Sequence, residues 1–308
     1  MSNHTLIIDG NNLAAINTHA HSSLSDRKGR HTGGTYGTIK QIRSMLLGPL
    51  SDYDFDRIFF AVDAGRPEFR MKLCPDYKGN RAKRKDDGFV EKYRETMKML
   101  PRFLKPLGIT IATIPGWEAD DVIAYETMTI PRPFVVCSGD KDLLQLTRQK
   151  NVHVYQPVQG DIIRKVPRGY VLRRCFEGDS SDNIKGVDGI GPVRAAAIIG
   201  DLPKGVSTVS KLFEFFEDGD NCADLPVLTK YAGKIAENEK ILRRNWKMMS
   251  LRYGFMQLKK QQLQPTYETG MLDMAEFDRM CRRHGFVSIR AELKQFFGFF
   301  KGIRDAAQ

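Results

Sequence analysis

The chain has 308 residues, enough for one large domain or two ordinary ones with a well-buried core. Lysine and arginine outnumber aspartate and glutamate by 48 to 37, and the net charge of +11 suits a polyanionic partner such as nucleic acid. The five cysteines are odd in number and lack CxxC spacing, which excludes a disulfide framework and a cysteine-based zinc site. Because there is no run of 18 apolar residues and no signal-like start, we expect a soluble intracellular protein.

The first two predicted strands each lead into an aspartate. The apolar run 5–8 precedes Asp9 and a Gly-Asn-Asn turn, and the run 57–62 precedes Asp63. Between them, apolar residues at helical spacing predict a helix from Tyr36 that stops at Gly48. Strands that alternate with helices predict an α/β fold, with a mostly parallel central sheet flanked by helices.

A basic segment follows within residues 69–105. Five of the eight residues from 78 to 85 are cations, and an aromatic side chain that could stack on a base precedes them. A bare charge run is more often a solvated connection, but this one lies between two strands that carry acids. We therefore expect a substrate clamp. Its candidate DNA-contacting residues are Tyr77, Lys78, Arg81, Lys83, Arg84 and Lys85.

The densest group of carboxylates lies between residues 114 and 146. A Pro-Gly turn opens a predicted helix whose first turn holds Glu118, Asp120 and Asp121. The apolar run 134–137 predicts a buried strand, and Asp140 and Asp142 follow its end. Acids at a helix start are common because the helix dipole favours them, so either group alone is ambiguous. Ligands bind outside the carboxyl ends of parallel strands, however, so these acids and those after the first two strands should meet at one edge of the sheet.

The second half of the chain is predicted to be mostly helical, ending in a core helix around the aromatic run 296–300. Asp179 and Asp182 are three residues apart and would share one face if this stretch is helical. A G-x-x-G-x-G turn precedes an apolar helix, and such a turn can direct several backbone N–H groups at a phosphate. We expect phosphate-backbone binding there rather than a plain helix–turn–helix. The glycines of the turn are Gly186, Gly189 and Gly191.

Nine carboxylates form the candidate metal site. Two like charges ~4 Å apart repel by roughly 4 kcal/mol at an effective dielectric of 20, so such a cluster requires cations. Oxygen ligands without histidine or cysteine select Mg²⁺ or Mn²⁺ over Zn²⁺, and two such ions ~3.5–4 Å apart would clamp a phosphodiester displacement. The sequence therefore predicts metal-assisted phosphodiester hydrolysis. The carboxylates are Asp9, Asp63, Glu118, Asp120, Asp121, Asp140, Asp142, Asp179 and Asp182.

Seven strings of the sequence resemble motifs of the 5′-nuclease family, in family order over about residues 5–200. They are LIIDGNN, GRHTGGTYGTIKQIRSML, IFFAVDAG with a following FR, YKGNRA, GWEADDVIA, SGDKDLLQL and GDSSDNIKGVDGIGP. The family comprises flap endonucleases, phage-type 5′–3′ exonucleases and the nuclease domain of bacterial DNA polymerase I. The resemblance implies an α/β nuclease domain with a helical arch, and a helix–three-turn–helix region that binds DNA. The stretch between Lys85 and Glu91 is less basic than an arch built for electrostatic threading.

The resemblance also implies a role for each matching residue. The acids around a first metal ion in the family match Asp9, Asp63, Glu118, Asp120 and Asp121. The acids around a second metal ion match Asp140, Asp142, Asp179 and Asp182. Lys78 and Arg81 match catalytic cations that contact the scissile phosphate, and Tyr77 matches a stacking aromatic. The glycine turn matches a duplex-binding turn that in relatives often holds K⁺ through backbone carbonyls.

From the resemblance we expect a structure-specific 5′ nuclease that uses two Mg²⁺ ions, or Mn²⁺ in their place, as flap endonuclease and 5′–3′ exonuclease. The expected partners are branched or 5′-ended duplex DNA and RNA–DNA hybrids, with no membrane. The protein would act as a monomer in the cytoplasm of a bacterial or phage-infected cell, in replication or repair that includes RNA-primer removal. The expected domains are a nuclease domain over 1–165 with its arch at about 69–105, a DNA-binding region over 166–255 and a C-terminal helical extension over 256–308 that packs on the core.

Two other functions compete with this expectation. A PIN-like ribonuclease also gathers acids at parallel strand ends, but such domains generally lack the glycine turn. A catalytically inactive protein that binds branched DNA would be expected to have lost acids, whereas every motif position is occupied here.

Overall fold

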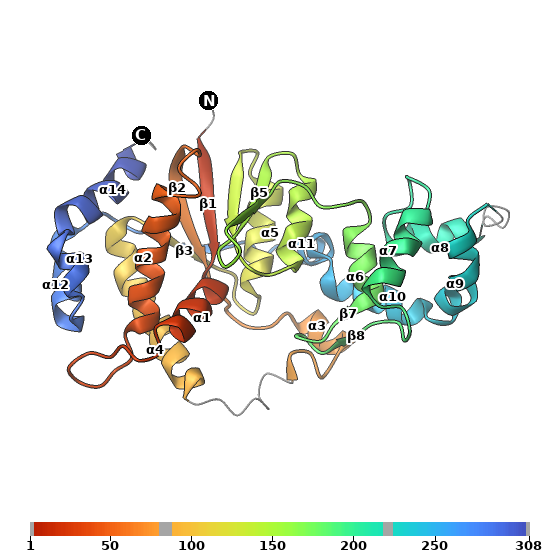
Figure 1. The fold of residues 1–308 in the computed structure, drawn as a ribbon, viewed down its shortest axis with the longest axis horizontal. Coiled ribbons are helices and arrows are strands. Elements are labelled where there is room, and N and C mark those ends of the chain that lie inside the picture. Colours follow the sequence, from red (N-terminus) through yellow and green to blue (C-terminus); the bar gives the residue numbers. More distant parts are fainter. Residues whose placement is uncertain (1–2, 80–87, 218–223, 306–308) are drawn as a thin grey trace. The chain divides into compact units, whose positions relative to one another are not determined.

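The computed structural model describes residues 3–79, 88–217 and 224–305 (Figure 1). The chain divides into two compact units. Unit 1 comprises Met1–Gly65, Asp86–Arg164 and Leu263–Gln308, and unit 2 comprises Arg66–Lys85 and Lys165–Gln262. Among the described helices, none combines the length and the apolar character that a membrane span requires.

Within the described residues, a seven-stranded sheet forms the centre of unit 1, in the order β6-β5-β4-β1-β2-β3-β9 (Figure 1). The five inner strands are parallel, and β6 and β9 close the two edges in antiparallel pairing. The prediction of an α/β fold with a mostly parallel sheet flanked by helices is confirmed. The strands are β1 (His4–Asp9), β2 (Phe55–Ala61), β3 (Thr110–Thr113), β4 (Phe134–Cys137), β5 (Val152–Gln156), β6 (Asp161–Ile163) and β9 (Thr266–Glu268).

The direction of the connections reverses between β1 and β4. From β1 the chain moves to β2 and β3 on one side, through α1 (Gly10–Ala20), α2 (Gly33–Leu47) and α4 (Phe89–Leu104). It then returns through α5 (Ala119–Thr129) to β4 on the other side of β1, and continues through η3 (Asp142–Arg148) to β5. Parallel crossovers are right-handed, so the two sets of helices cover opposite faces of the sheet. The carboxyl ends of β1 and β4 therefore form a topological switch point, where α/β proteins bind their ligands.

One large apolar core fills the face of the sheet that α1, α2 and α4 cover. Leu6 and Ile8 of β1 and Phe60 of β2 are buried in it. The C-terminal segment contributes Phe296 and Phe300, which are 2% exposed. The helices of this segment are α12 (Met274–His284), α13 (Val287–Ala291) and α14 (Leu293–Asp305), and α12 and α14 pack near η2 (Lys105–Leu107), which follows α4.

Unit 2 is mostly helical. It contains a short two-stranded sheet of β7 (Gly178–Asp179) and β8 (Ile184–Lys185), so the stretch from Asp179 to Asp182 is not helical and the shared helix face considered for these two acids does not form. A second departure is β9, a strand of unit 1 in a stretch predicted to be helical. The helices of unit 2 are α3 (Glu68–Leu73), α6 (Tyr170–Glu177), α7 (Pro192–Asp201), α8 (Val209–Glu217), α9 (Pro226–Glu237), α10 (Glu239–Met249) and α11 (Leu251–Lys260).

Candidate functional site at the acidic edge of the sheet

Asp9 lies at the switch point and organises the acidic edge. It ends β1 and caps α1, where one carboxylate oxygen accepts the Asn12 backbone N–H at 3.0 Å. Its other oxygen accepts the Ser138 hydroxyl at 2.7 Å, across from the end of β4. The same hydroxyl accepts the Asp140 N–H at 2.9 Å, and the Asp140 carboxylate accepts the Asp142 N–H at 2.7 Å. Hydrogen bonds thus link three of the predicted acids through Ser138.

Asp63 follows β2 and is held against the start of α5. Its carboxylate accepts the Ala119 N–H at 2.8 Å, a bond that satisfies one free donor of the first helical turn. Gly65 lies so close to Gly116 that an added Cβ would stand 2.7 Å from the Gly116 Cα. Backbone bonds from Gly116 to Ala64 and from Ala64 to Trp117, both 2.9 Å, fix this approach. The two glycines therefore allow the loops that carry Asp63 and Glu118 to meet.

The three acids predicted for the start of a helix lie there. Glu118 is the N-cap of α5, and Asp120 and Asp121 occupy its first turn. Glu118 is 3% exposed and Asp121 is fully buried, whereas Asp120 is half-buried. The positive end of the helix dipole favours carboxylates at this position, although two buried ones require further compensation.

Sequence reasoning missed two asparagines that hold the neighbouring strand ends. Asn11 accepts the Asp63 N–H at 2.8 Å through its side-chain oxygen, and Asn12 accepts the Gly139 N–H at 2.9 Å in the same way. The only signal was their place in the LIIDGNN string, directly after Asp9. Each asparagine reaches from the end of β1 to the loop after an adjacent strand.

The pKa of Asp9 reflects its burial and the acids around it. Burial raises the pKa of Asp9 to about 7, against the hydrogen bonds from Asn12 and Ser138, and the carboxylates of Asp140 and Asp63 add to the rise. In the part of the chain that the structure describes, no three Asp, Glu, His or Cys side chains lie close enough together to enclose a metal ion by themselves. Magnesium is usually held by one or two carboxylates with water and substrate phosphate rather than by an all-protein cage. The oxygen-only donors that gather at this edge fit Mg²⁺ or Mn²⁺.

The other two predicted metal acids belong to unit 2. Asp179 pairs with Arg174 at 2.5 Å and accepts the Ser181 hydroxyl at 2.6 Å. Burial alone would raise its pKa, but the bonds from Ser181 and the charge of Arg174 lower it below the ordinary value. The Asp182 carboxylate lies 3.8 Å from the Lys78 ammonium. Their predicted role at a second metal with Asp140 and Asp142 stays a prediction.

Lys78 and Tyr77 are placed in unit 2 with Asp182. Both are buried, at 8% and 4% exposed, and the Lys78 ammonium lies 5.0 Å from the centre of the Tyr77 ring. The Lys78 N–H donates to the Asp182 carbonyl at 3.0 Å from a backbone with φ of 56°, a conformation that favours glycine. The predicted stacking of Tyr77 on a base and the contact of Lys78 with phosphate stay predictions. Arg81, Lys83, Arg84 and Lys85 lie outside the described residues.

The glycine turn precedes α7, as the motif predicts. Gly191 caps the helix, and Gly189 has a φ of 75°. The Gly189 carbonyl accepts an Arg194 N–H at 2.6 Å, and the Asp188 carbonyl accepts the Lys234 ammonium at 2.9 Å. The turn thus presents carbonyl oxygens to cations. The predicted binding of K⁺ and duplex DNA stays a prediction.

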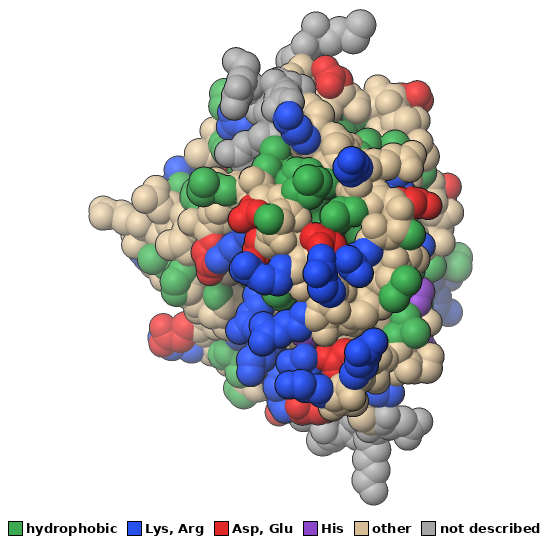
Figure 2. All heavy atoms as spheres, turned by 90° about the vertical axis from the view of Figure 1, so that its left-hand side faces the viewer, with side chains coloured by type: hydrophobic (Ala, Val, Ile, Leu, Met, Phe, Trp, Pro, Cys, Tyr) green, Lys and Arg blue, Asp and Glu red, His purple; other side chains and the backbone are tan. Residues whose placement is uncertain are grey.

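Basic side chains gather on the face of unit 1 that α4 and α12 form (Figure 2). A hollow of about 230 Å³ on these elements is lined by four cations, two glutamates (Glu91 and Glu95), Met99 and His284. Lysine and arginine side chains in such numbers suit the phosphates of a nucleic acid backbone. The cations that line the hollow are Arg30, Arg94, Lys98 and Arg102.

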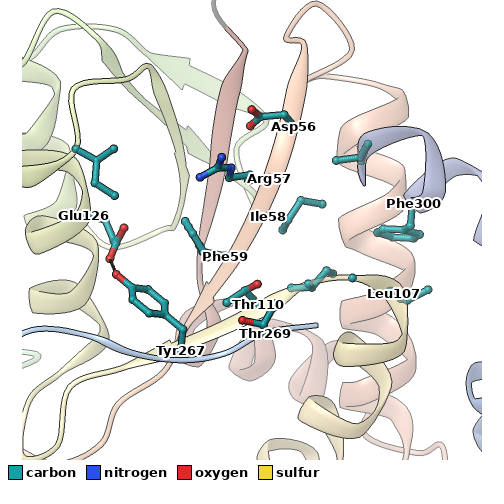
Figure 3. A pocket seen from close by; sticks show the side chains of 14 residues that line it. Asp56, Arg57, Ile58, Phe59, Leu107, Thr110, Glu126, Tyr267, Thr269 and Phe300 are labelled. Atoms are coloured by element: carbon teal, nitrogen blue, oxygen red, sulfur yellow. Dashed lines mark hydrogen bonds between the residues drawn. The ribbon is translucent and has the colours of Figure 1, made fainter. Parts of the chain in front are cut away.

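A cavity of about 560 Å³ lies apart from the acids, at the amino ends of β2 and β3 (Figure 3). Phe59, Thr110 and Tyr267 line it, and the Tyr267 hydroxyl donates to Glu126 at 2.5 Å. Burial raises the pKa of Glu126, whereas the Tyr267 bond lowers it. This cavity therefore lies away from the carboxyl ends of the strands and is not part of the acidic site.

Three kinds of similarity agree with this architecture. The family described as 5′-3′ exonuclease, N-terminal resolvase-like domain, matches residues 4–172. A 5′-3′ exonuclease of Buchnera aphidicola is 31% identical over 212 residues, which are 64% of this chain and 70% of the relative. DNA polymerase I of Mycobacterium tuberculosis is 31% identical over 209 residues, 62% of this chain, and the match spans 22% of the polymerase.

Solved structures with the same fold include two flap endonucleases. The bacteriophage T5 D15 flap endonuclease, in a complex with DNA and metal ions, has a TM-score of 0.61 at 19% identity, covering 98% of this chain and 99% of that one. Flap endonuclease-1 from Methanococcus jannaschii has a TM-score of 0.54 at 17% identity, covering 100% and 94%.

The fold and the acidic edge define the class, an α/β protein whose site lies at the carboxyl ends of its parallel strands. Within that class, the chain belongs to the 5′-3′ exonuclease family, because the family match covers more than half of the sequence. Membership in this family makes the protein a nuclease.

Proposed function

We propose that the chain is a structure-specific 5′ nuclease that hydrolyses DNA phosphodiesters with two divalent metal ions, as a 5′-flap endonuclease and 5′–3′ exonuclease. The observation that carries the proposal is Asp9 at the switch point, which is linked by hydrogen bonds through Ser138 to Asp140 and Asp142 and whose pKa is raised by burial and, to a smaller extent, by its acidic neighbours. An enzyme that bound no cation would gain nothing from this arrangement, which costs folding free energy.

Each predicted acid has a part in the proposal. The first ion would be held by the acids of β1, β2 and α5, and the second by those after β4 together with those of unit 2. Bound Mg²⁺ or Mn²⁺ would stabilise the charge that develops on the reacting phosphate. The first set is Asp9, Asp63, Glu118, Asp120 and Asp121, and the second set is Asp140, Asp142, Asp179 and Asp182.

Cations of the chain would hold the substrate. In the proposal, Lys78 and Arg81 contact the scissile phosphate, and the glycine turn binds duplex backbone with the help of K⁺. Both carbonyls that the turn already offers to Arg194 and Lys234 have a second lone pair, which supports a cation there. The T5 relative is described with DNA and metal ions, and human GEN1, with a TM-score of 0.52, with Holliday-junction DNA. We extend this to branched DNA, RNA–DNA hybrids and a replication or repair role, including RNA-primer removal, for a cytoplasmic monomer.

The test is a cleavage assay on a 5′-end-labelled flap duplex, in Mg²⁺, in Mn²⁺ and in EDTA, beside a single-stranded RNA of equal length. We expect metal-dependent product near the junction of single strand and duplex. Asp142→Asn should lower the rate by at least about 100-fold while flap binding changes little, because the variant loses charge but keeps its shape. The control is Asp52→Asn, which changes an exposed aspartate before β2.

Each other outcome points to a different function. Release of mononucleotides alone would support metal-dependent hydrolysis and a 5′–3′ exonuclease, and would contradict the endonuclease activity. Cleavage of the RNA but not the flap would favour the PIN-like ribonuclease. Tight flap binding without cleavage in either metal would identify a binding protein, and an Asp142→Asn enzyme at the wild-type rate would overturn the metal assignment.

A further inference from the structure

Asn11 joins the end of β2 to a helix that is distant in the sequence. Its side-chain oxygen accepts the Asp63 N–H at 2.8 Å, and its side-chain nitrogen donates to the Tyr93 hydroxyl at 2.9 Å. The amide thus uses one group toward the acidic edge and the other toward α4. Because both bonds come from one planar group, loss of the Tyr93 bond would change the orientation of the Asn11 amide and with it the position of Asp63.

Tyr93 has defined surroundings within unit 1. It is half-buried against the apolar core and stacks on Phe89, one turn earlier in α4, with ring centres 5.8 Å apart and planes 15° from parallel. The ring is therefore held in place independently of its hydroxyl. A hydroxyl on a fixed ring orients the Asn11 amide, since a rotating amide would lose both partners.

Asp63 needs such an anchor because it is exposed and lies outside the strand ladder. Its carboxylate accepts the Ala119 N–H at 2.8 Å and its own N–H donates to Asn11, so both the side chain and the main chain of Asp63 are held by hydrogen bonds. The bond from Asn11 sets where the main chain of Asp63 lies, and the bond from Ala119 sets the carboxylate. Partners of this kind, behind the ligands of a metal, commonly change metal affinity by 10- to 100-fold when they are lost.

We propose that Asn11 and Tyr93 are positioning residues that hold Asp63 ready for a divalent cation and connect the start of α4 to the acidic edge. The inference rests on the proposed function, because it takes Asp63 as a metal ligand. Asn12 performs the matching task on the other side of β1, through the Gly139 N–H. The Asn-Asn pair that follows Asp9 in the sequence is thereby explained by the two strand ends that it spans.

Tyr93→Phe is the decisive variant. It removes one oxygen and leaves the stacked ring, so the fold should persist. We expect about a threefold to tenfold rise in the Mn²⁺ dissociation constant, measured without DNA by the paramagnetic signal of free Mn²⁺. The Mg²⁺ concentration for half-maximal flap cleavage should rise by a similar factor, KM for the flap should stay within about twofold, and saturating Mg²⁺ should restore the rate. Asn11→Ala should show the same pattern with a larger change.

The matched control is Tyr36→Phe. Tyr36 is also half-buried against the same core, and its hydroxyl bonds to Ser288 at 2.8 Å, on α13 rather than at the acidic edge. A purely structural role predicts a lower melting temperature for both variants and unchanged Mn²⁺ affinity. That result would overturn the inference, as would a Tyr93→Phe loss confined to KM. Failure of the proposed function is a separate result, since the wild-type enzyme itself would then not cleave the flap.

Discussion

A single buried carboxyl group, Asp9, is the residue on which the acidic edge depends. It ends a strand, caps a helix and links two acidic loops, and it does so without a cation of its own among the contacts that raise or lower its pKa. The side chain therefore destabilises the metal-free fold so that the edge can hold positive charge. Functional sites commonly retain such costs.

The stability of the metal-free protein should depend on pH through Asp9. Below about pH 4 the carboxyl is protonated in both the folded and the unfolded chain, and it imposes no penalty. As the pH rises, the unfolded chain ionises first because the folded pKa is about 7, so the folded state loses stability until about pH 7. The change from an ordinary value near 4 corresponds to at most ~4 kcal/mol in the free energy of unfolding.

Asp9→Asn should remove this loss. The amide oxygen can still accept the Asn12 N–H, so the helix cap is kept. In EDTA, we expect the variant to be more stable than the wild type at pH 8 by up to a few kcal/mol and equal to it near pH 4, measured by urea denaturation. Mg²⁺ should stabilise the wild type and not the variant. Equal stability of the two proteins at pH 8, with Asp52→Asn as control, would contradict the account.

At the scale of single residues, the sequence predicted the acids better than the residues that hold them in place by hydrogen bonds. Aspartates after apolar runs are visible in one sequence because a strand and its end are local patterns. Asn11, Asn12 and Ser138 each bond to the end of an adjacent strand or to the loop that follows it, and this pairing depends on strand order, which local patterns do not contain. The clamp cations after Gly79 fall outside the described residues, so their predicted role is open to experiment.

At the scale of elements, the approach of two loops decides the shape of the edge. Gly65 has a φ of 143° and lies against Gly116, where a side chain would meet backbone atoms. The loop after β2 and the loop before α5 can thus be bonded to each other directly. The sequence marked Gly116 only as part of a Pro-Gly turn and did not indicate that it would meet Gly65, because glycine marks turns far more often than close contacts between loops.

Gly65→Ala should separate these loops. The added methyl group would meet the Gly116 backbone in a conformation that alanine rarely adopts, so we expect a loss of about 1–3 kcal/mol in the free energy of unfolding. Because the displaced loop carries Asp63, the Mg²⁺ requirement for cleavage should also rise. The control is Gly200→Ala, at a site in α7 where an added Cβ meets no atom within 4 Å and should be neutral or slightly stabilising. Wild-type stability and metal dependence in Gly65→Ala would show that the close contact is not needed.

The elements that were wrongly predicted contain few buried residues, so the sequence shows no pattern of apolar and polar positions there. All three residues of β9 are exposed, so the strand has no alternation of apolar and polar positions. Asp179 and Asp182 were given helical spacing, but Gly178 has a φ of 73° and turns the chain into β7 and a tight loop. In both places the decisive information was a pairing partner or a glycine conformation rather than periodicity.

At the scale of the whole molecule, each unit is assembled from separate stretches of the chain. The sheet of unit 1 takes its last strand, β9, from the C-terminal segment, and its core takes Phe277, Phe296 and Phe300 from the same segment. The boundaries expected from the sequence, at about 165 and 255, remain a prediction about domains. The contacts of residues 263–305 nevertheless make them part of the core that supports the acidic edge.

Removal of residues 263–308 should therefore unfold unit 1 rather than trim it. The truncated chain would expose the apolar face of β2 and α4 and leave β3 as an open sheet edge, and both promote aggregation. We expect loss of cooperative unfolding and of soluble protein, measured by circular dichroism and sedimentation. Removal of 306–308 alone is the control and should have no effect. A soluble, cleaving 1–262 fragment would show that the segment is dispensable.

The late position of this segment has a consequence during protein synthesis. Most of the acids are translated early, yet the core beneath them cannot close until residues 263–305 have left the ribosome. A nascent chain would then carry the chemical groups of a nuclease without the rigid frame that aligns them. Under the proposed function, the order of the sequence itself would keep an unfinished enzyme from cutting the DNA around it.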